Sequence, residues 1–159
     1  MLKKSLLPIS APDSTILILG TLPGEKSLEL QQYYAHPRNR FWKFLENAYN
    51  SNVPINYAEK IKWLKNNKIA LWDVAHSAER LGSLDANMKQ VEPNDLIDFL
   101  GKYPSIQRIA FNGQKAEKLY DKYFTRTASY SFISLPSSSP ANTRFTYAQL
   151  QADWLKLKQ

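Results

Sequence analysis

Four short apolar runs punctuate the chain, and longer stretches of mixed polarity separate them. The runs are ILIL (16–19), IALWDV (69–74), IQRIAF (106–111) and SFISL (131–135). Each has the length and the β-branched or aromatic content of a strand that is buried on both faces. The pattern therefore predicts four strands of a parallel sheet.

Between these runs, apolar residues recur at the three- and four-residue spacing of helices. Five helices are predicted, and the residues that mark them are Phe41, Trp42, Leu45, Ala48 and Tyr49; Tyr57, Ile61 and Leu64; Leu96, Phe99 and Leu100; Ala116, Leu119, Tyr120 and Tyr123; and, from about Thr146, Leu150, Trp154 and Leu157. Alternating strands and helices indicate an α/β fold, a three-layer α/β/α sandwich with a central, mainly parallel four-stranded sheet. The chain shows no repeat or linker, so we expect residues 1–159 to form one domain.

The polar and turn-forming residues of the chain collect directly after the predicted strands. These segments are GTLPG (20–24), DVAHSAERLGSLDAN (73–87), NGQKA (112–116) and LPSSSPAN (135–142). Ligands of open α/β sheets bind beyond the carboxyl ends of the strands. We therefore expect these four segments to form the functional site.

Composition and charge narrow the class of partner. The net charge is +7, and a basic chain favours polyanions such as nucleic acid, because each neutralised phosphate releases counterions. Scattered lysines of an ordinary soluble protein are the alternative interpretation. No cysteine is present, which excludes a disulfide framework, a cysteine-based zinc site and a thiol nucleophile.

The sequence also gives no sign of a metal site, a signal peptide or a membrane span. His36 and His76 are the only histidines and have no metal-ligand spacing, so we expect neither a metal nor another cofactor. The first fourteen residues contain no apolar run long enough for a signal peptide or a membrane span. We therefore expect a cytoplasmic protein without membrane contact, and we interpret this start as a short lead-in to the first strand.

The stretch YYAHPRNRFW combines rings, fixed positive charge and a neutral amide within ten positions. Tyr33 and Tyr34 could stack on bases, a contact that contributes about 1–3 kcal/mol per base in single-strand binders. Arg38 and Arg40 could hold phosphates. Asn39 stays neutral while offering donors and acceptors, so it could orient a water molecule or bond a base edge.

The same residues could instead have purely structural roles. Phe41 and Trp42 fit a helix core better than a ligand site, and the arginines could simply be solvated. His36 precedes a proline and could serve the turn instead of catalysis. Asp85, in the segment after the second strand, could cap a helical turn or line a pocket.

The two glycine- or serine-rich segments are weak signals when taken singly. GTLPG is neither a dinucleotide fingerprint nor a phosphate-binding P-loop, so it could be an ordinary strand-to-helix connection. LPSSSPAN offers hydroxyl and N–H groups that can bind phosphates. No histidine and aspartate lie nearby in the sequence to activate one of its serines, so we do not expect a serine nucleophile.

Together, GTLPG after the first strand, AHPRNRFW, and LPSSSPAN after the fourth strand resemble the uracil-DNA glycosylase superfamily over nearly the whole chain. The AHPRNRFW segment is similar to that of the mismatch-specific uracil/thymine glycosylases. The combination of GTLPG with LPSSSPAN resembles the hypoxanthine-DNA, or DNA-deoxyinosine, glycosylase branch. The resemblance implies a base-flipping pocket in which a damaged base leaves the duplex.

The resemblance also implies roles for individual residues. Asn39 takes the catalytic role, Tyr34 stacks on the flipped base, and the LPSSSPAN loop enters the minor groove. The residues implied for the base-binding pocket are Gly20, Thr21, Leu22, Pro23, Gly24, Tyr34, His36 and Asp85. Those implied for DNA binding are Arg38, Arg40, Ser137, Ser138, Ser139 and Asn142.

Three positions depart from the pattern of the superfamily. Leu22 stands where the uracil- and mismatch-specific branches have a catalytic aspartate or asparagine, and Leu135 stands where they have histidine or asparagine. Ser139 replaces the bulky leucine with which many relatives plug the duplex. We therefore expect flipping to rely on the instability of a damaged or mismatched pair.

The function implied is monofunctional hydrolysis of an N-glycosidic bond in DNA, with hypoxanthine as the base. One alternative is the same reaction on uracil or thymine opposite guanine. A second is a DNA-binding module without catalysis, to which Leu22 and Leu135 point. A third is a basic α/β enzyme that acts on a nucleotide or another small anion. We expect a monomer, because a base flipper of this size presents one face to the duplex.

Overall fold

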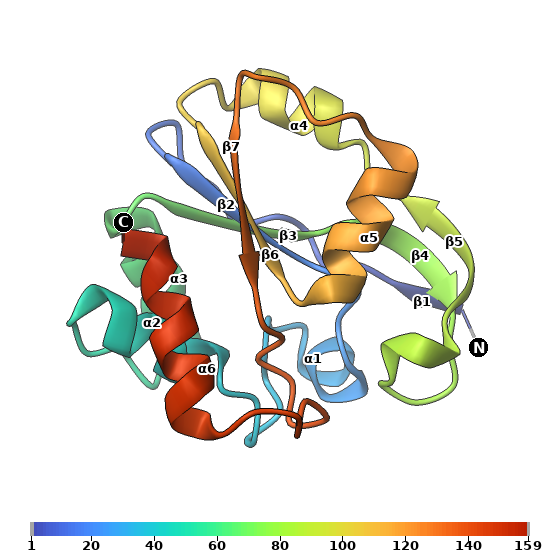
Figure 1. Ribbon diagram of the computed structural model, residues 1–159, viewed down its shortest axis with the longest axis horizontal. Helices are drawn as coiled ribbons and strands as arrows, with labels where there is room; N and C mark the ends of the chain where they lie inside the picture. The colour runs from blue at the N-terminus through green and yellow to red at the C-terminus, as the bar shows by residue number, and fades with distance from the viewer. Residues whose placement is uncertain (1, 159) are drawn as a thin grey trace.

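The computed structural model describes residues 2–158 and contains the predicted central sheet (Figure 1). Its strands are β2 (Ile16–Gly20), β3 (Ile69–Asp73), β6 (Arg108–Asn112) and β7 (Ser131–Leu135). They are all parallel and lie in the order β3-β2-β6-β7. The four apolar runs thus become the four strands, as predicted, although β6 begins two residues later than its run.

Helices cover both faces of this sheet, which confirms the three-layer arrangement (Figure 1). Alternate residues of β2 face opposite layers: Ile16 and Ile18 join one core cluster, whereas Leu17 and Leu19 join the other. The first layer contains α2 (Phe41–Tyr49), α3 (Tyr57–Asn66), α6 (Tyr147–Trp154) and the 3-10 turn η2 (Leu155–Lys158). The second layer contains α4 (Leu96–Lys102) and α5 (Gln114–Tyr123).

The five predicted helices are present, and their polar ends explain where they begin. Thr146 caps α6 through a capping box: its side chain accepts from the N–H of Gln149, whose side chain accepts from the N–H of Thr146. Asn56 caps α3 with its side chain alone, which accepts from the N–H of Glu59. A further short helix, α1 (Glu25–Leu30), follows the GTLPG segment.

A second, smaller sheet was not predicted. It is antiparallel in the order β1-β4-β5, from β1 (Leu2–Lys4), β4 (Ala75–Glu79) and β5 (Lys89–Pro93). The lead-in therefore contains a strand, β1, and the turn-forming segment after β3 begins with another, β4. Their sequences, LKK, AHSAE and KQVEP, lack the apolar runs by which the other strands were recognised. These strands gain their order from pairing with one another, which no local pattern encodes.

No helix within residues 2–158 is long and apolar enough to cross a membrane.

Candidate active site

One pocket lies at the carboxyl ends of the parallel strands, where the sequence predicted the site. Its volume is about 100 Å³, several times the roughly 10–15 Å³ that a single water molecule needs. The residues that line it are Gly20, Thr21, Leu22, Pro23, Gly24, Ser27, Tyr33, Tyr34, His36, Asn39, Asp73, Ser83, Asp85, Asn112, Ser137, Ser138 and Ser139. Segments from four parts of the chain therefore converge on one cavity.

Gly20 lines the pocket at a position where no side chain fits. A Cβ atom at Gly20 would lie 2.6 Å from Oδ1 of Asp73 and 2.8 Å from the hydroxyl of Tyr34. Both distances are too short for non-bonded contact. The last residue of β2 must therefore be glycine for these two polar groups to approach each other at the base of the cavity.

Asn39 is held at the pocket wall by its amide oxygen. Oδ1 accepts hydrogen bonds from the backbone N–H of Phe41, at 3.0 Å, and from the hydroxyl of Ser138, at 2.9 Å. Because a backbone N–H can only donate, the atom that faces it must be the oxygen. Nδ2 makes no hydrogen bond to any residue from 2 to 158. Asn39 thus presents a donor, and not an acceptor, to the cavity.

A buried pair supports Asn39 from below. The side chain of Asn112, at the end of β6, donates to the hydroxyl of Ser138 and accepts from the N–H of Ser138, at 3.0 and 2.9 Å. Ser138 is only 1% exposed, so its hydroxyl cannot reach a DNA phosphate. The structure therefore gives Ser138 a supporting contact with Asn39 in place of the predicted DNA contact.

Tyr34 offers one ring face to the cavity, because Phe41 stacks on the other at 3.9 Å between ring centroids. Its backbone is left-handed, with φ of 52°, which turns the chain between α1 and α2. The hydroxyl is buried without a hydrogen-bond partner among residues 2–158. Burial, and then the nearby charge of Asp73, raise the pKa of Tyr34, so the hydroxyl stays protonated and available as a donor.

Tyr33, by contrast, is buried in the core and donates to the carbonyl oxygen of Leu7.

Asp73 is the main residue that sequence reasoning missed. It ends β3, is 3% exposed, and its Oδ2 is buried without a hydrogen-bond partner among residues 2–158. Burial, and then the charge of Asp85, raise its pKa to about 7, and the cation of Arg80 opposes the shift. A carboxyl group with a strongly raised pKa in a cleft marks a functional position. The available signal was an aspartate at the carboxyl end of an apolar strand.

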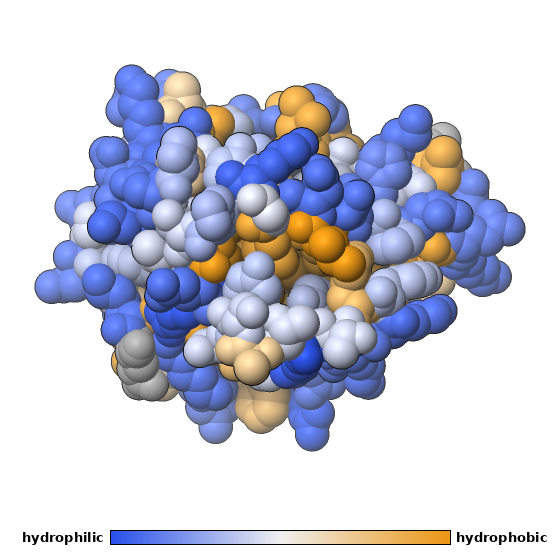
Figure 2. Space-filling view, turned by 90° about the horizontal axis from the view of Figure 1, so that it is seen from above, coloured by the Kyte–Doolittle hydropathy of each residue, from blue (hydrophilic) through white to orange (hydrophobic). Residues whose placement is uncertain are grey.

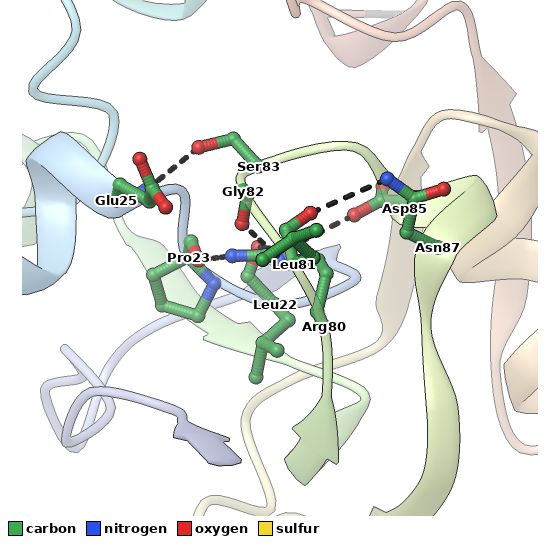
Figure 3. Close-up of polar contacts among 9 residues, drawn as sticks. All are labelled: Leu22, Pro23, Glu25, Arg80, Leu81, Gly82, Ser83, Asp85 and Asn87. Atoms are coloured by element: carbon green, nitrogen blue, oxygen red, sulfur yellow. Dashed lines mark hydrogen bonds and ion pairs between the residues drawn. The ribbon is translucent and has the colours of Figure 1, made fainter. Parts of the chain in front are cut away.

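Arg80 fixes the GTLPG segment to the segment that joins β4 and β5, residues 80–88. Its guanidinium is buried and donates to the carbonyl oxygens of Leu22 and Pro23 (Figure 3). It also bonds the carbonyl oxygen of Gly82 at 3.0 Å and Oδ1 of Asp85 at 3.4 Å. Two carbonyl groups of the GTLPG segment, those of Leu22 and Pro23, therefore point toward Arg80.

Asp85 lies on the pocket wall and does not cap a helical turn. It is the first residue of a 3-10 turn, η1 (Asp85–Asn87), whose N-cap is Leu84. Burial raises the pKa of Asp85, whereas the neighbouring Arg80 lowers it. His36 is exposed at the pocket rim, and its Nδ1 accepts from the N–H of Arg38, which stabilises the turn before α2.

Three of the residues implied for DNA binding do not line the pocket. Arg40 donates to the carbonyl oxygens of Ser139, at 2.6 Å, and Asn142, at 3.2 Å, so it holds the LPSSSPAN loop in place. The side chain of Asn142 donates to the carbonyl oxygen of Ser137, within the same loop. Arg38 is exposed and remains free to meet a phosphate. Within residues 2–158, no group of acidic or histidine side chains is arranged to hold a metal ion.

Comparison with known proteins agrees with this geometry. The sequence model of the uracil DNA glycosylase superfamily matches residues 7–158. The chain is similar to a hypoxanthine DNA glycosylase of Methanosarcina acetivorans, with 37% identity over 97% of this chain and 96% of that protein. It is also similar to a hypoxanthine DNA glycosylase of Methanosarcina barkeri, with 37% identity over 91% of this chain and 90% of that protein.

The fold has a close counterpart among solved structures. A solution NMR structure from Methanosarcina acetivorans, described as a candidate uracil DNA glycosylase, superimposes with a TM-score of 0.81 and 36% identity over the whole of both chains. The family match covers nearly the full sequence and agrees with the resemblance carried by the three motifs. The chain therefore belongs to the uracil DNA glycosylase superfamily.

Proposed function

We propose that this protein is a monofunctional DNA glycosylase that hydrolyses the N-glycosidic bond of a flipped deoxyinosine and releases hypoxanthine. The observation that carries the proposal is the pairing of the Asn39 donor with an unpartnered carboxyl group, Asp73, in one cavity. The two hypoxanthine DNA glycosylases at 37% identity support the choice of base.

Asp73 suits the edge of a deaminated base. A protonated carboxyl group offers one donor and one acceptor side by side, which matches the C6=O and N1–H groups of hypoxanthine. Its raised pKa of about 7 keeps much of it protonated at neutral pH. The base leaves with negative charge, so a neutral Asp73 that donates to O6 stabilises the transition state, whereas an ionised one opposes it.

Tyr34 and Asn39 complete the environment of the base. The free face of the Tyr34 ring stacks on the base. Nδ2 of Asn39 donates to the departing base. Both lone pairs of Oδ1 are already used, so Asn39 does not orient the attacking water through this oxygen. An amide that donates in place contributes orientation and electrostatic stabilisation.

Leu22 has no part in polar catalysis. It is 7% exposed and packs against Ala75 and Ala78, so the position that carries a polar catalytic residue in other branches is apolar here. We infer that the catalytic contribution of that position has passed to Asn39 and Asp73 on the other walls of the pocket.

The experiment is single-turnover cleavage of labelled duplexes that hold one deoxyinosine, deoxyuridine or mismatched thymine, followed by alkali to break abasic sites. We expect cleavage at deoxyinosine by the natural protein and its loss in Asn39→Ala. Cleavage at uracil or mismatched thymine alone would favour the mismatch-specific alternative. Binding without any cleavage would instead favour a non-catalytic DNA-binding module.

Two finer features belong to the same proposal. We propose that the protein acts as a monomer, which sedimentation at equilibrium would test, and that it acts in the cytoplasm, which fractionation of its source cells would test. The affinity for duplex DNA should fall as the salt concentration rises. An affinity that does not change with salt concentration would contradict a polyanionic substrate and would favour an enzyme that acts on small anions.

A further inference from the structure

Two exposed leucines stand beside the pocket. Leu81 is 80% exposed and Leu84 is 54% exposed. Leu84 lies between Ser83 and Asp85, both of which line the cavity. Single exposed leucines are ordinary, but two within four residues at the rim of a binding site form an apolar tip. Figure 1 shows their segment, between β4 and β5, at the same end of the molecule as α1.

The segment that carries this tip is tied firmly to the pocket. Besides the four acceptors of Arg80, the hydroxyl of Ser83 accepts from the N–H of Glu25 at 2.9 Å (Figure 3). The side chain of Asn87 donates to the carbonyl oxygen of Leu81 at 3.3 Å. The polar groups are therefore engaged within the protein while the leucine side chains face solvent.

The loop on the opposite wall cannot supply an apolar plug. Residues 136–142, PSSSPAN, contain no side chain larger than proline or asparagine. Ser139 is further restrained, because its hydroxyl accepts from the N–H of Ala141 and its carbonyl oxygen accepts from Arg40. These seven residues therefore supply no bulky apolar side chain to fill the space of a flipped nucleotide.

We propose that Leu81 and Leu84 are the wedge that enters the base stack when the target nucleotide leaves it. This inference rests on the proposed function. Apolar side chains that insert between base steps offset part of the cost of unstacking, and they keep the flipped base from returning. The pocket and the wedge are held together by Arg80, so the base enters the cavity as the leucines fill the gap.

The test compares duplex with single-stranded DNA, since only a duplex needs a wedge. Single-turnover cleavage of deoxyinosine is measured in both substrates for the natural protein and for the double variant Leu81→Ala/Leu84→Ala. Exposed leucines tolerate alanine with little loss of stability. We expect the duplex-to-single-strand rate ratio to fall about ten- to a hundredfold, the factor that corresponds to burial of a leucine side chain.

A matched control lies at the other end of the molecule. Ile97 is 74% exposed on α4, beside a hollow of about 470 Å³ between α4 and α5 that Figure 2 shows as an apolar patch. Ile97→Ala should leave the ratio unchanged. Leu84→Met, introduced together with Leu81→Met, should restore it, because a flexible apolar side chain of similar volume still fills the gap.

A second measurement needs no cleavage. The fluorescence of 2-aminopurine placed beside an abasic-site analogue should rise on binding the natural protein and not on binding the double alanine variant. Equal rate ratios and equal fluorescence in all proteins would overturn the wedge while leaving the glycosylase intact. Parallel loss of cleavage in both DNA forms would also overturn it, because the segment would then only shape the pocket. Leucine-dependent fluorescence without any cleavage would uphold the wedge and refute the proposed function.

Discussion

At the scale of single residues, the chemistry of the pocket depends on which atoms are already engaged. The motif AHPRNRFW marked Asn39, but only the contacts of its oxygen with Phe41 and Ser138 make it a donor. Asp73 differs from Asn39 in that no motif marked it. Burial, and then the charge of Asp85, give its carboxyl group an unusual pKa. Each residue leads to a separate prediction.

Replacing the donor of Asn39 should remove catalysis while preserving the fold. In Asn39→Asp, one carboxylate oxygen keeps the two contacts that Oδ1 makes, and Nδ2 is lost. We expect kcat for deoxyinosine cleavage to fall about 10²–10³-fold, as for removal of one donor to a developing anion. Single-turnover kinetics measure this, with thermal unfolding as the control for folding. Unchanged kcat would show that Asn39 acts through its oxygen.

The carboxyl group of Asp73 should give the reaction a pH dependence. Since the protonated form assists the departing base, kcat should fall as pH rises through about 7, by about tenfold per pH unit above it. Asp73→Asn keeps one donor and one acceptor without a titrating group, so its profile should be flat over pH 6–9. A profile of the natural protein that rises through pH 7 would contradict the assignment.

The pKa of Asp73 should also make the stability of the fold depend on pH, which can be measured without substrate. The pKa of Asp73 is raised on folding from 3.8 to about 7, so the native state binds its proton more tightly than the unfolded chain does. The stabilisation is complete below pH 3.8 and is lost as pH rises to about 7, with little further change above. The difference in melting temperature between Asp73→Asn and the natural protein should therefore grow between pH 4 and 7.

At the scale of elements, the pocket is built from connections and not from the strands themselves. The GTLPG segment after β2 is shaped by Arg80, which follows β4 in the other sheet. The LPSSSPAN loop after β7 is shaped by Arg40, which precedes α2. Each pocket loop thus takes its form from a cation located far away in the sequence, because buried carbonyl oxygens need donors.

Arg80 should accordingly contribute strongly to stability. Arg80→Met keeps most of the volume but leaves buried carbonyl oxygens without donors, so we expect the free energy of unfolding to fall by about 2–4 kcal/mol. Urea unfolding measures the difference. Arg38→Met, at an exposed arginine, serves as the control and should change stability by less than about 0.5 kcal/mol. Equal stability of both variants would show that the Arg80 contacts are weak.

At the scale of the whole molecule, the site occupies one end and the basic charge is spread over the chain. The net charge of +7 attracts DNA in general, whereas the pocket sets which base reacts. Arg38 is the exposed arginine nearest in sequence to Asn39, so it is placed to hold a phosphate close to the flipped nucleotide.

Removal of that contact should be visible in the salt dependence of binding. Arg38→Ala should reduce the slope of log K against log salt concentration by about 0.9, the value for one phosphate on duplex DNA. Titration of a fluorescent duplex at several salt concentrations measures the slope. Lys62, which is 70% exposed on α3 and pairs with Glu59, is the control position, and Lys62→Ala should leave the slope unchanged.

The sequence by itself determined the central sheet, the helices and the segments that meet at the pocket. Apolar runs and helical spacing are local signals, and parallel strands bring their carboxyl ends to one edge whatever the loops contain. Motif resemblance added the family and Asn39. The antiparallel sheet was not recognisable, because AHSAE and KQVEP carry no apolar alternation of their own.

Only the tertiary structure decided what each polar group does. Ser138 is a support and not a DNA contact because it is buried beneath Asn39, and Arg40 is engaged because the LPSSSPAN loop folds over it. Asp73 stays partly protonated at neutral pH because folding removes it from water beside another carboxyl group. Burial, pKa and the supply of free donors depend on what surrounds a side chain in three dimensions, and residue order does not specify these surroundings locally.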